Sequence, residues 1–127
     1  MLLVVSFAEA EIELRHEDPE DETRVIIAKG EIHVSTANAV SSALSASLDA
    51  GRCRIVLDLS DVGFIDSTGL SVLLNGLRRV TRAKGRLALV CTSPTVLRLF
   101  AITRLDTTFD IVATRKQALA RVARDVA

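Results

Sequence analysis

The sequence has no tryptophan, no tyrosine and only four phenylalanines among its 127 residues. Proteins that hold single-stranded nucleic acid commonly stack the bases on aromatic side chains, and this chain offers few of them. Its sixteen Lys and Arg residues are balanced by sixteen Asp and Glu residues, so no net positive charge attracts phosphates or an anionic membrane. Direct binding to nucleic acid is therefore not expected.

Cysteine and histidine are also scarce, with two residues of each. Cys53 and Cys91 lie in or beside predicted core strands, which favours reduced thiols that pack in the core over a disulfide. Two cysteines and two distant histidines also make a poor set of zinc ligands. No metal site and no cofactor are expected.

The sequence contains no long apolar run near its start. Residues 1–5 are Met-Leu-Leu-Val-Val, which is too short for a signal peptide or a membrane span and includes no basic residue. We therefore expect a cytoplasmic protein with no membrane partner.

Recognisable catalytic motifs are missing as well. The chain has no Gly-x-x-x-x-Gly-Lys phosphate loop, and no glycine stands two residues before Ser67 as a nucleophile elbow requires. Neither histidine can be assigned as a base for Ser67. The protein is therefore not expected to be an enzyme.

Hydrophobic residues make up 49% of the chain and charged residues 25%, which is ordinary for one soluble domain spanning residues 1–127. Apolar periodicity predicts an alternation of strands and helices, so we expect an α/β fold with a mixed, largely parallel sheet of about five strands. The predicted strands are 11–15, 24–29, 55–59, 86–91 and 108–112. The predicted helices are 35–48, a segment from 66 or 67 to near 85, 94–100 and a terminal helix after Thr114. The order Ser93-Pro94, a cap followed by proline, begins the third of these helices. Thr114 and Gln117 form a capping box for the terminal helix, in which Leu119, Val122 and Val126 make one apolar stripe.

Several residues are expected to shape these elements. Ser35 is predicted to cap the first helix, and Gly51 to close it. Asp58 lies in an otherwise apolar strand, where its charge needs a partner or an exposed end. Residues 1–50 hold ten acidic and three basic residues, whereas residues 51–127 hold six and thirteen. This imbalance predicts that acidic surface from the first part of the chain faces basic surface from the second part. The alternative is a charge asymmetry that serves partner binding.

The most informative stretch is 55–77, where an apolar strand runs through a short turn into an amphipathic helix. Asp66-Ser67-Thr68-Gly69 stands at the helix start, where unpaired amides and the positive end of the helix dipole favour an anion. Ser67 can be the N-cap, or Asp66 can be the cap with Ser67 as the first helical residue. Gly69 is unfavourable within a helix, which suggests close approach of a partner or of neighbouring backbone.

The run Phe64-Ile65-Asp66-Ser67-Thr68-Gly69-Leu70, preceded by Ile55-Val56-Leu57-Asp58-Leu59, resembles the bacterial anti-sigma factor antagonists, which are small members of the STAS family. Gly30-Glu31-Ile32 and Ser93-Pro94-Thr95-Val96-Leu97-Arg98-Leu99-Phe100 match that family at the same intervals, so the resemblance covers most of the chain. It implies four helices packed mainly on one side of the sheet. It also implies that Ser67 is phosphorylated by an anti-sigma factor serine kinase, its binding partner, and that a serine phosphatase removes the phosphate.

The resemblance places the partner-binding surface at Asp66, Ser67, Thr68, Gly69 and His33, with Thr68 ranked second to Ser67 as an acceptor. Many family members have an aspartate where this chain has His33. A neutral histidine can still form hydrogen bonds and a protonated one would favour phosphate, while a passive surface histidine is the alternative. A second functional hypothesis is a STAS subunit of a transport or sensory complex that is never phosphorylated. A small-molecule-binding enzyme on the same fold is the weakest hypothesis.

Overall fold

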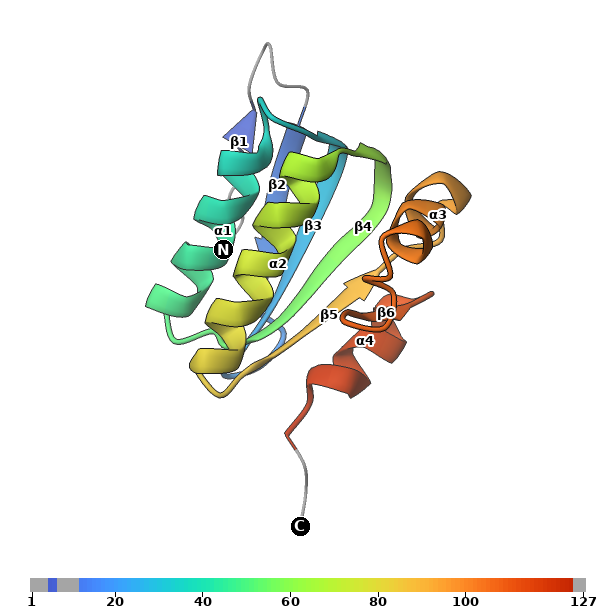
Figure 1. Cartoon of the computed structure of the whole chain (residues 1–127). Helices are drawn as coiled ribbons and strands as arrows, with labels where there is room; N and C mark the ends of the chain where they lie inside the picture. Colours follow the sequence, from blue (N-terminus) through green and yellow to red (C-terminus); the bar gives the residue numbers. More distant parts are fainter. Residues whose placement is uncertain (1–4, 7–11, 125–127) are drawn as a thin grey trace.

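The computed structural model describes residues 5–6 and 12–124 and contains one mixed sheet with four helices (Figure 1). The strand order is β1-β2-β3-β4-β5-β6. Strands β1, β2 and β3 pair antiparallel, whereas β3 to β6 run parallel. The elements are β1 (Val5–Ser6), β2 (Ile12–Glu17), β3 (Thr23–Ile32), α1 (Ala37–Asp49), β4 (Arg54–Ile65), α2 (Ser67–Arg82), β5 (Arg86–Val90), α3 (Pro94–Ile102), β6 (Asp110–Val112) and α4 (Arg115–Val122).

The predicted fold class is confirmed, and each of the five predicted strands and four predicted helices has its counterpart. The sheet has a sixth strand that was not predicted, the two-residue β1, whose Val5 pairs with Leu14 of β2. Two residues are too few to produce a recognisable apolar alternation. The predicted apolar position Val126 of the terminal helix lies outside the described residues.

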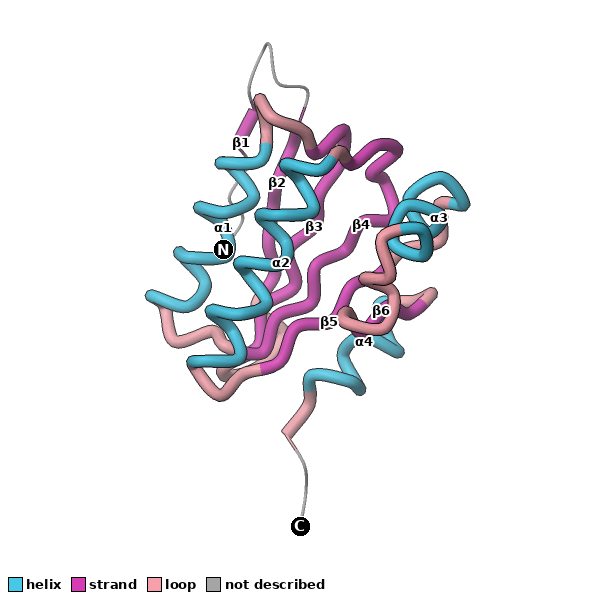
Figure 2. The backbone as a smooth tube through the Cα atoms, in the orientation of Figure 1, coloured by secondary structure: helices cyan, strands magenta, loops and turns pink. Residues whose placement is uncertain are grey.

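The sheet is covered unequally on its two faces (Figure 2). Helices α1, α2 and α3 pack on one face, over a large core that includes Ile26 and Ala28 of β3. Helix α4 packs on the other face, where Val25 and Ile27 belong to a smaller cluster around Ala118. Because side chains alternate along a strand, β3 supplies apolar residues to both cores and therefore has a nearly continuous apolar sequence.

The predicted cap of the first helix was wrong by one residue. Thr36, not Ser35, is the N-cap of α1, and its side chain does not cap the helix. Instead, the Thr36 hydroxyl donates to the Glu31 carbonyl at 2.7 Å and accepts from the His33 amide at 2.9 Å. The buried Thr36 thus joins the loop to the end of β3, while Ser35 stays exposed. Gly51, at φ +77°, follows the helix end as predicted.

Asp58 has the partners that its place in an apolar strand requires. Its carboxylate accepts from the Ser60 hydroxyl at 2.6 Å, the Ser60 amide at 2.9 Å and Arg115 Nη2 at 3.0 Å. Burial alone would raise the pKa of Asp58, but the hydrogen bonds from Ser60 and Arg115 outweigh burial and lower it. The Arg115 guanidinium also lies 3.3 Å from Glu17 in the acidic half of the chain.

Both cysteines are free thiols, as predicted. Cys91 is buried, and that burial raises the pKa of its thiol, whereas Cys53 is half-buried. Within the described residues, no group of histidine, cysteine and acidic side chains has the arrangement of a metal site. Nor does any helix in the described part of the chain have the length and apolar character needed to cross a membrane.

Candidate functional site

The candidate site lies where the parallel strands β3 and β4 end side by side. Ile32 pairs with Ile65 at the carboxyl ends of these strands, and α1 and α2 begin just beyond them. The Asp66 amide donates to the Ile32 carbonyl at 3.1 Å, which holds the two connections together. Functional residues commonly gather at this edge of an open α/β sheet because loops from several strands meet there.

Asp66 is the N-cap of α2, and Ser67 is the first helical residue. Asp66 Oδ1 accepts from the Gly69 amide at 2.9 Å, which is the capping bond. Asp66 Oδ2 accepts from the Val34 amide at 3.2 Å and so ties the loop between β3 and α1 to the start of α2. Of the two cap assignments that the sequence left open, the one with Asp66 as cap is confirmed.

The side chains of Ser67 and Thr68 point outward at the first turn of α2, and both residues are exposed. Among the described residues, neither hydroxyl takes part in a hydrogen bond. The amides of Ser67 and Thr68 have no carbonyl partner inside the helix because they belong to its first turn. A freely accessible hydroxyl therefore stands beside two unpaired amides at the positive end of a helix of 16 residues.

Gly69 is buried against the protein's own backbone. A Cβ atom at this position would lie 2.7 Å from the Ile32 carbonyl oxygen and 2.8 Å from Ile65 Cγ2. Close approach of neighbouring backbone, one of the two explanations weighed for this glycine, is confirmed. The contact allows the start of α2 to lie directly on the ends of β3 and β4.

His33 lies in the loop that Asp66 holds, and it is half-buried. Its Nδ1 accepts from the Ser35 amide at 3.1 Å. Its Nε2 lies 3.5 Å from Glu31 Oε1. Within the described part of the chain, His33 makes no hydrogen bond to Ser67 or Asp66, and the link between them runs through the neighbouring Val34 amide.

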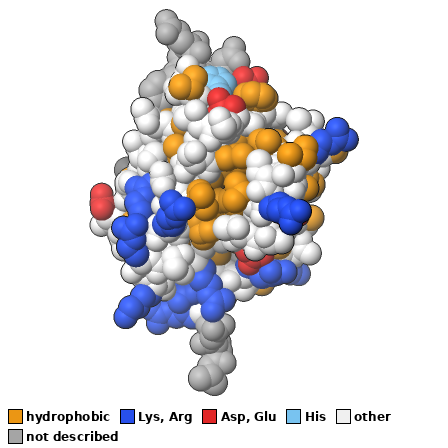
Figure 3. All heavy atoms as spheres, viewed as in Figure 1, with side chains coloured by type: hydrophobic (Ala, Val, Ile, Leu, Met, Phe, Trp, Pro, Cys, Tyr) orange, Lys and Arg blue, Asp and Glu red, His pale blue; other side chains and the backbone are white. Residues whose placement is uncertain are grey.

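Two exposed apolar residues adjoin this helix start, and sequence reasoning did not select them. Val34 is 71% exposed and Phe64 is 45% exposed. Figure 3 shows apolar, acidic and histidine side chains together at this end of the molecule. The sequence features that could have identified them are an apolar residue within the polar loop 33–36 and an aromatic residue close to the end of a strand. Exposed apolar side chains that form one contiguous patch commonly mark a partner-binding surface.

The STAS domain family model matches residues 14–118, which include every element just described except β1, the first two residues of β2 and the end of α4. The chain belongs to the STAS domain family. Its relatives in this family include bacterial anti-sigma factor antagonists. The anti-sigma-B factor antagonist of Bacillus subtilis is 36% identical over 94 residues, which cover 74% of this chain and 84% of the relative.

Solved structures of STAS proteins agree with the fold. An anti-sigma factor antagonist from Mycobacterium paratuberculosis superimposes with a TM-score of 0.80 at 32% identity, covering 91% of this chain and 97% of that chain. The Bacillus cell fate determinant SpoIIAA in its phosphorylated form superimposes with a TM-score of 0.65 at 25% identity, covering 85% of this chain and 97% of that chain. The match predicted from the residues around Ser67 is thus confirmed for the family and for its fold.

Proposed function

We propose that this STAS protein is an anti-sigma factor antagonist controlled by phosphorylation of Ser67. In its unphosphorylated form it binds an anti-sigma factor serine kinase in the cytoplasm and so frees the sigma factor. Phosphorylation releases it from the kinase, and a serine phosphatase restores the binding form. The observation that carries the proposal is the exposed Ser67 hydroxyl at the first position of α2, beside the exposed apolar Val34 and Phe64.

The surface around Ser67 suits a contact that a charge can break. When a partner covers Val34 and Phe64, water is removed from the neighbouring Ser67 as well. A neutral hydroxyl tolerates this desolvation, whereas a phosphate brings about −1.5 to −2 charges into the same place. A binding surface that combines exposed apolar side chains with the start of a helix can therefore lose most of its affinity for a partner when Ser67 is phosphorylated.

The helix start would accommodate the phosphate only in part. Unpaired amides at Ser67 and Thr68 and the helix dipole favour an anion. The Gly69 amide, however, is already occupied by the Asp66 carboxylate, whose own negative charge lies one residue away. Phosphate and carboxylate would share the same turn, so the added charge remains largely uncompensated and faces the partner.

The transfer reaction itself belongs to the kinase in this proposal. Both carboxylate oxygens of Asp66 accept amide hydrogen bonds, so Asp66 is a positioning residue rather than a base for Ser67. The γ-phosphoryl group of ATP passes to Ser67 Oγ, the hydroxyl proton passes to a base of the kinase, and ADP leaves. The proposed contact includes Asp66, Ser67, Thr68, Gly69 and His33, with Gly69 acting through backbone packing and His33 through the loop.

Phosphorylation by a cognate anti-sigma factor kinase with ATP tests the acceptor. Mass spectrometry should find one phosphate on Ser67 in the native protein and in Thr68→Ala, and none in Ser67→Ala. Because both residues are exposed on the same turn, Thr68→Ala is a matched control for Ser67→Ala. Phosphate confined to Thr68 or Ser71, or its absence with an active kinase, would contradict the assignment.

Titration calorimetry against the unphosphorylated partner tests the switch. Ser67→Ala should bind about as well as the native protein, whereas Ser67→Glu should bind at least about tenfold more weakly, since it places a charge at the contact. Part of the glutamate penalty should shrink at higher ionic strength. Equal affinity of the two folded variants would favour a STAS subunit that is not regulated by phosphorylation.

A further inference from the structure

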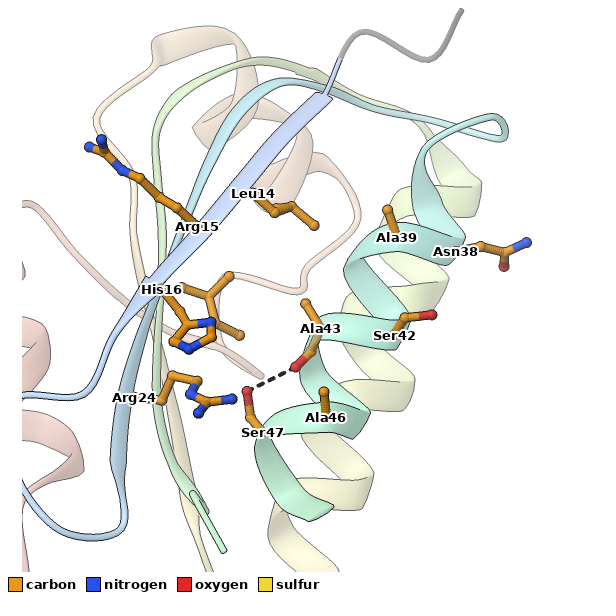
Figure 4. Close-up of a pocket in the computed structure, with 11 residues that line it drawn as sticks. Leu14, Arg15, His16, Arg24, Asn38, Ala39, Ser42, Ala43, Ala46 and Ser47 are labelled. Atoms are coloured by element: carbon orange, nitrogen blue, oxygen red, sulfur yellow. Dashed lines mark hydrogen bonds between the residues drawn. The ribbon is translucent and has the colours of Figure 1, made fainter. Parts of the chain in front are cut away.

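A cavity of about 310 Å³ opens between α1 and the strands β2 and β3, on the face of the sheet that carries α1 and α2 (Figure 4). The described residues that line it are Leu14, Arg15, His16, Arg24, Ile26, Asn38, Ala39, Ser42, Ala43, Ala46 and Ser47. They include none of the residues assigned to the contact around Ser67. The cavity is therefore a separate feature of the domain.

The cavity exists because α1 presents small side chains toward β2. Leu14 and Ile26 line it with apolar side chains from the strands. Ala39 and Ala43 line it from the helix (Figure 4). Figure 4 shows Asn38 and Ser42 pointing away from the sheet and Arg15 pointing away from α1, so their side chains leave the space free. Ligand cavities in proteins span about 300 to 1,000 Å³ and are mostly apolar with a few placed polar groups. This one has the size and the lining for a small molecule.

One end of the cavity carries a buried cation. The side chain of Arg24 is 11% exposed, and Asp18 accepts from its Nε at 2.8 Å and from its Nη2 at 3.1 Å. Within the described residues, the third nitrogen, Nη1, donates no hydrogen bond. Asp18 is also shared with Arg52, whose Nε lies 3.7 Å away, so that one carboxylate serves two guanidinium groups.

His16 completes this polar end. Figure 4 shows its ring beside Arg24 and facing α1, near Ser47. Among the described residues, its side chain has no hydrogen-bond partner. Burial and the neighbouring Arg24 guanidinium lower the pKa of His16, so its ring is neutral at pH 7 and can donate one N–H. None of the described residues that line the cavity is acidic.

We propose that this cavity binds a small amphipathic carboxylate, with its apolar body against Leu14, Ile26 and Ala43 and its carboxylate at Arg24 and His16. The carboxylate supplies the acceptor that Arg24 Nη1 lacks and balances the surplus positive charge left by two guanidinium groups on one Asp18. A charge-assisted hydrogen bond to arginine is about twice as strong as a neutral one. The proposal does not depend on the role of Ser67.

The two histidines make the test direct, because His16 lines the cavity and His33 lies outside it. Imidazole signals in NMR spectra are followed while octanoate is added to the 127-residue protein. His16 should shift saturably with a Kd below about 1 mM, while His33 stays unmoved. Octanol, with the same chain but no charge, should bind at least about fivefold more weakly, and acetate, with the charge but no chain, should not bind.

Two variants check the location. Ala43→Leu fills the cavity and should abolish the octanoate shift, whereas Ala120→Leu, the same change on the exposed face of α4, should leave it intact. Arg24→Gln should reduce octanoate affinity about tenfold, to the level of octanol. Thermal melts establish that each variant is folded, and if Arg24→Gln unfolds, the octanol comparison still measures the role of charge. Absence of a saturable His16 shift, equal affinity for octanol and octanoate, or unchanged binding to folded Ala43→Leu would overturn the proposal.

Discussion

The two ends of the parallel strands are constructed in opposite ways. At the end where β3, β4 and β5 begin, side chains from distant segments are joined by ion pairs and close packing. Asp18 holds Arg24 and Arg52, Glu22 pairs with Arg124, and Arg54 Nη1 donates to the Val122 carbonyl at 2.7 Å. Acidic residues of the first half of the chain thus meet basic residues of the second half, which confirms the predicted complementarity. We call this the closed end.

At the end where β3 and β4 finish, the joining contacts are made by backbone amides, the Asp66 carboxylate and the Thr36 hydroxyl. Asp66 caps α2 and holds the β3–α1 loop, while Ser67 and Thr68 have no side-chain partner within the described residues. Val34 and Phe64 remain exposed there. We call this the open end. The difference indicates that backbone amides, with Asp66 and Thr36 as their side-chain partners, fix the open end and leave Ser67 and Thr68 available to a partner, whereas the closed end uses its side chains for stability.

The largest expected effect comes from the middle of α2, on which both ends depend. Leu73 is completely buried, so Leu73→Ala should destabilise the domain by about 2 to 5 kcal/mol. Leu77 is only half-buried, and Leu77→Ala should cost less, about 1 to 2 kcal/mol. Urea denaturation measures both values. If Leu77→Ala cost as much as Leu73→Ala, the buried face of the helix would be assigned incorrectly.

A pair of glycines sharpens the comparison between the ends. At the closed end, a Cβ atom on Gly85 would lie 1.9 Å from the Cys53 carbonyl oxygen, whereas a Cβ atom on Gly63, near the end of β4, would meet nothing within 4 Å. Gly85→Ala should therefore cost about 3 kcal/mol, because rigid backbone must move, and Gly63→Ala should change stability by less than about 1 kcal/mol. Thermal melts of both variants check this. Similar losses in the two variants would mean that the Cys53 backbone does not hold the position of Gly85 tightly.

Features that depend on neighbouring residues could be predicted from the sequence. The change from a strand period to a helical period after Gly69, the Ser93-Pro94 helix start and the capping box of Thr114 with Gln117 are encoded within a few residues, and the structure shows all three. The start of α2 was located for the same reason. Only its cap stayed open, because Asp66 and Ser67 are adjacent and both are good caps.

Features that depend on distant residues could not be predicted. The hydrogen bond from Val34 to Asp66 joins residues 32 positions apart, and it determines where the exposed Val34 lies. Thr36 rather than Ser35 stands at the N-cap position of α1, where its hydroxyl donates to the Glu31 carbonyl. This contact depends on how the loop folds. The cavity beside α1 is likewise a gap between small side chains of α1 and residues of β2, and an apolar pattern does not show a gap.

Replacing the cap tests whether Asp66 alone organises the open end. Asp66→Ala removes the hydrogen bonds from the Gly69 and Val34 amides and should lower the free energy of unfolding by about 1 to 2 kcal/mol. It should also weaken binding to the partner. Asp66→Asn keeps one acceptor oxygen and should cost about half as much. Denaturant melts and titration calorimetry measure the two effects. Equal losses in stability for both variants would show that the negative charge of the cap, rather than its hydrogen bonds, stabilises the helix start.

The smallest expected effect is an acid-dependent one at the closed end. The hydrogen bond from Arg24 lowers the pKa of Asp18 in the folded protein, despite the opposing effect of burial. The unfolded chain binds the proton more readily, with a pKa of about 3.9, so this carboxylate stabilises the fold above that pH. The contribution is lost as pH falls from about 4 through the lower folded pKa, when Asp18 becomes protonated in both states.

Asp18→Asn isolates this contribution. At pH 7 the variant should be less stable than the native protein by about 1 kcal/mol, and the difference should shrink as the pH falls below about 4. Asp49→Asn changes an exposed carboxylate that has no ion pair within the described residues and serves as the matched control, with little difference at any pH. Urea melts at pH 7, 5, 4 and 3 measure both series. If the difference in stability between Asp18→Asn and the native protein stayed constant down to pH 3, the charge of this carboxylate would not stabilise the closed end. The contrast with the open end would then rest on packing alone.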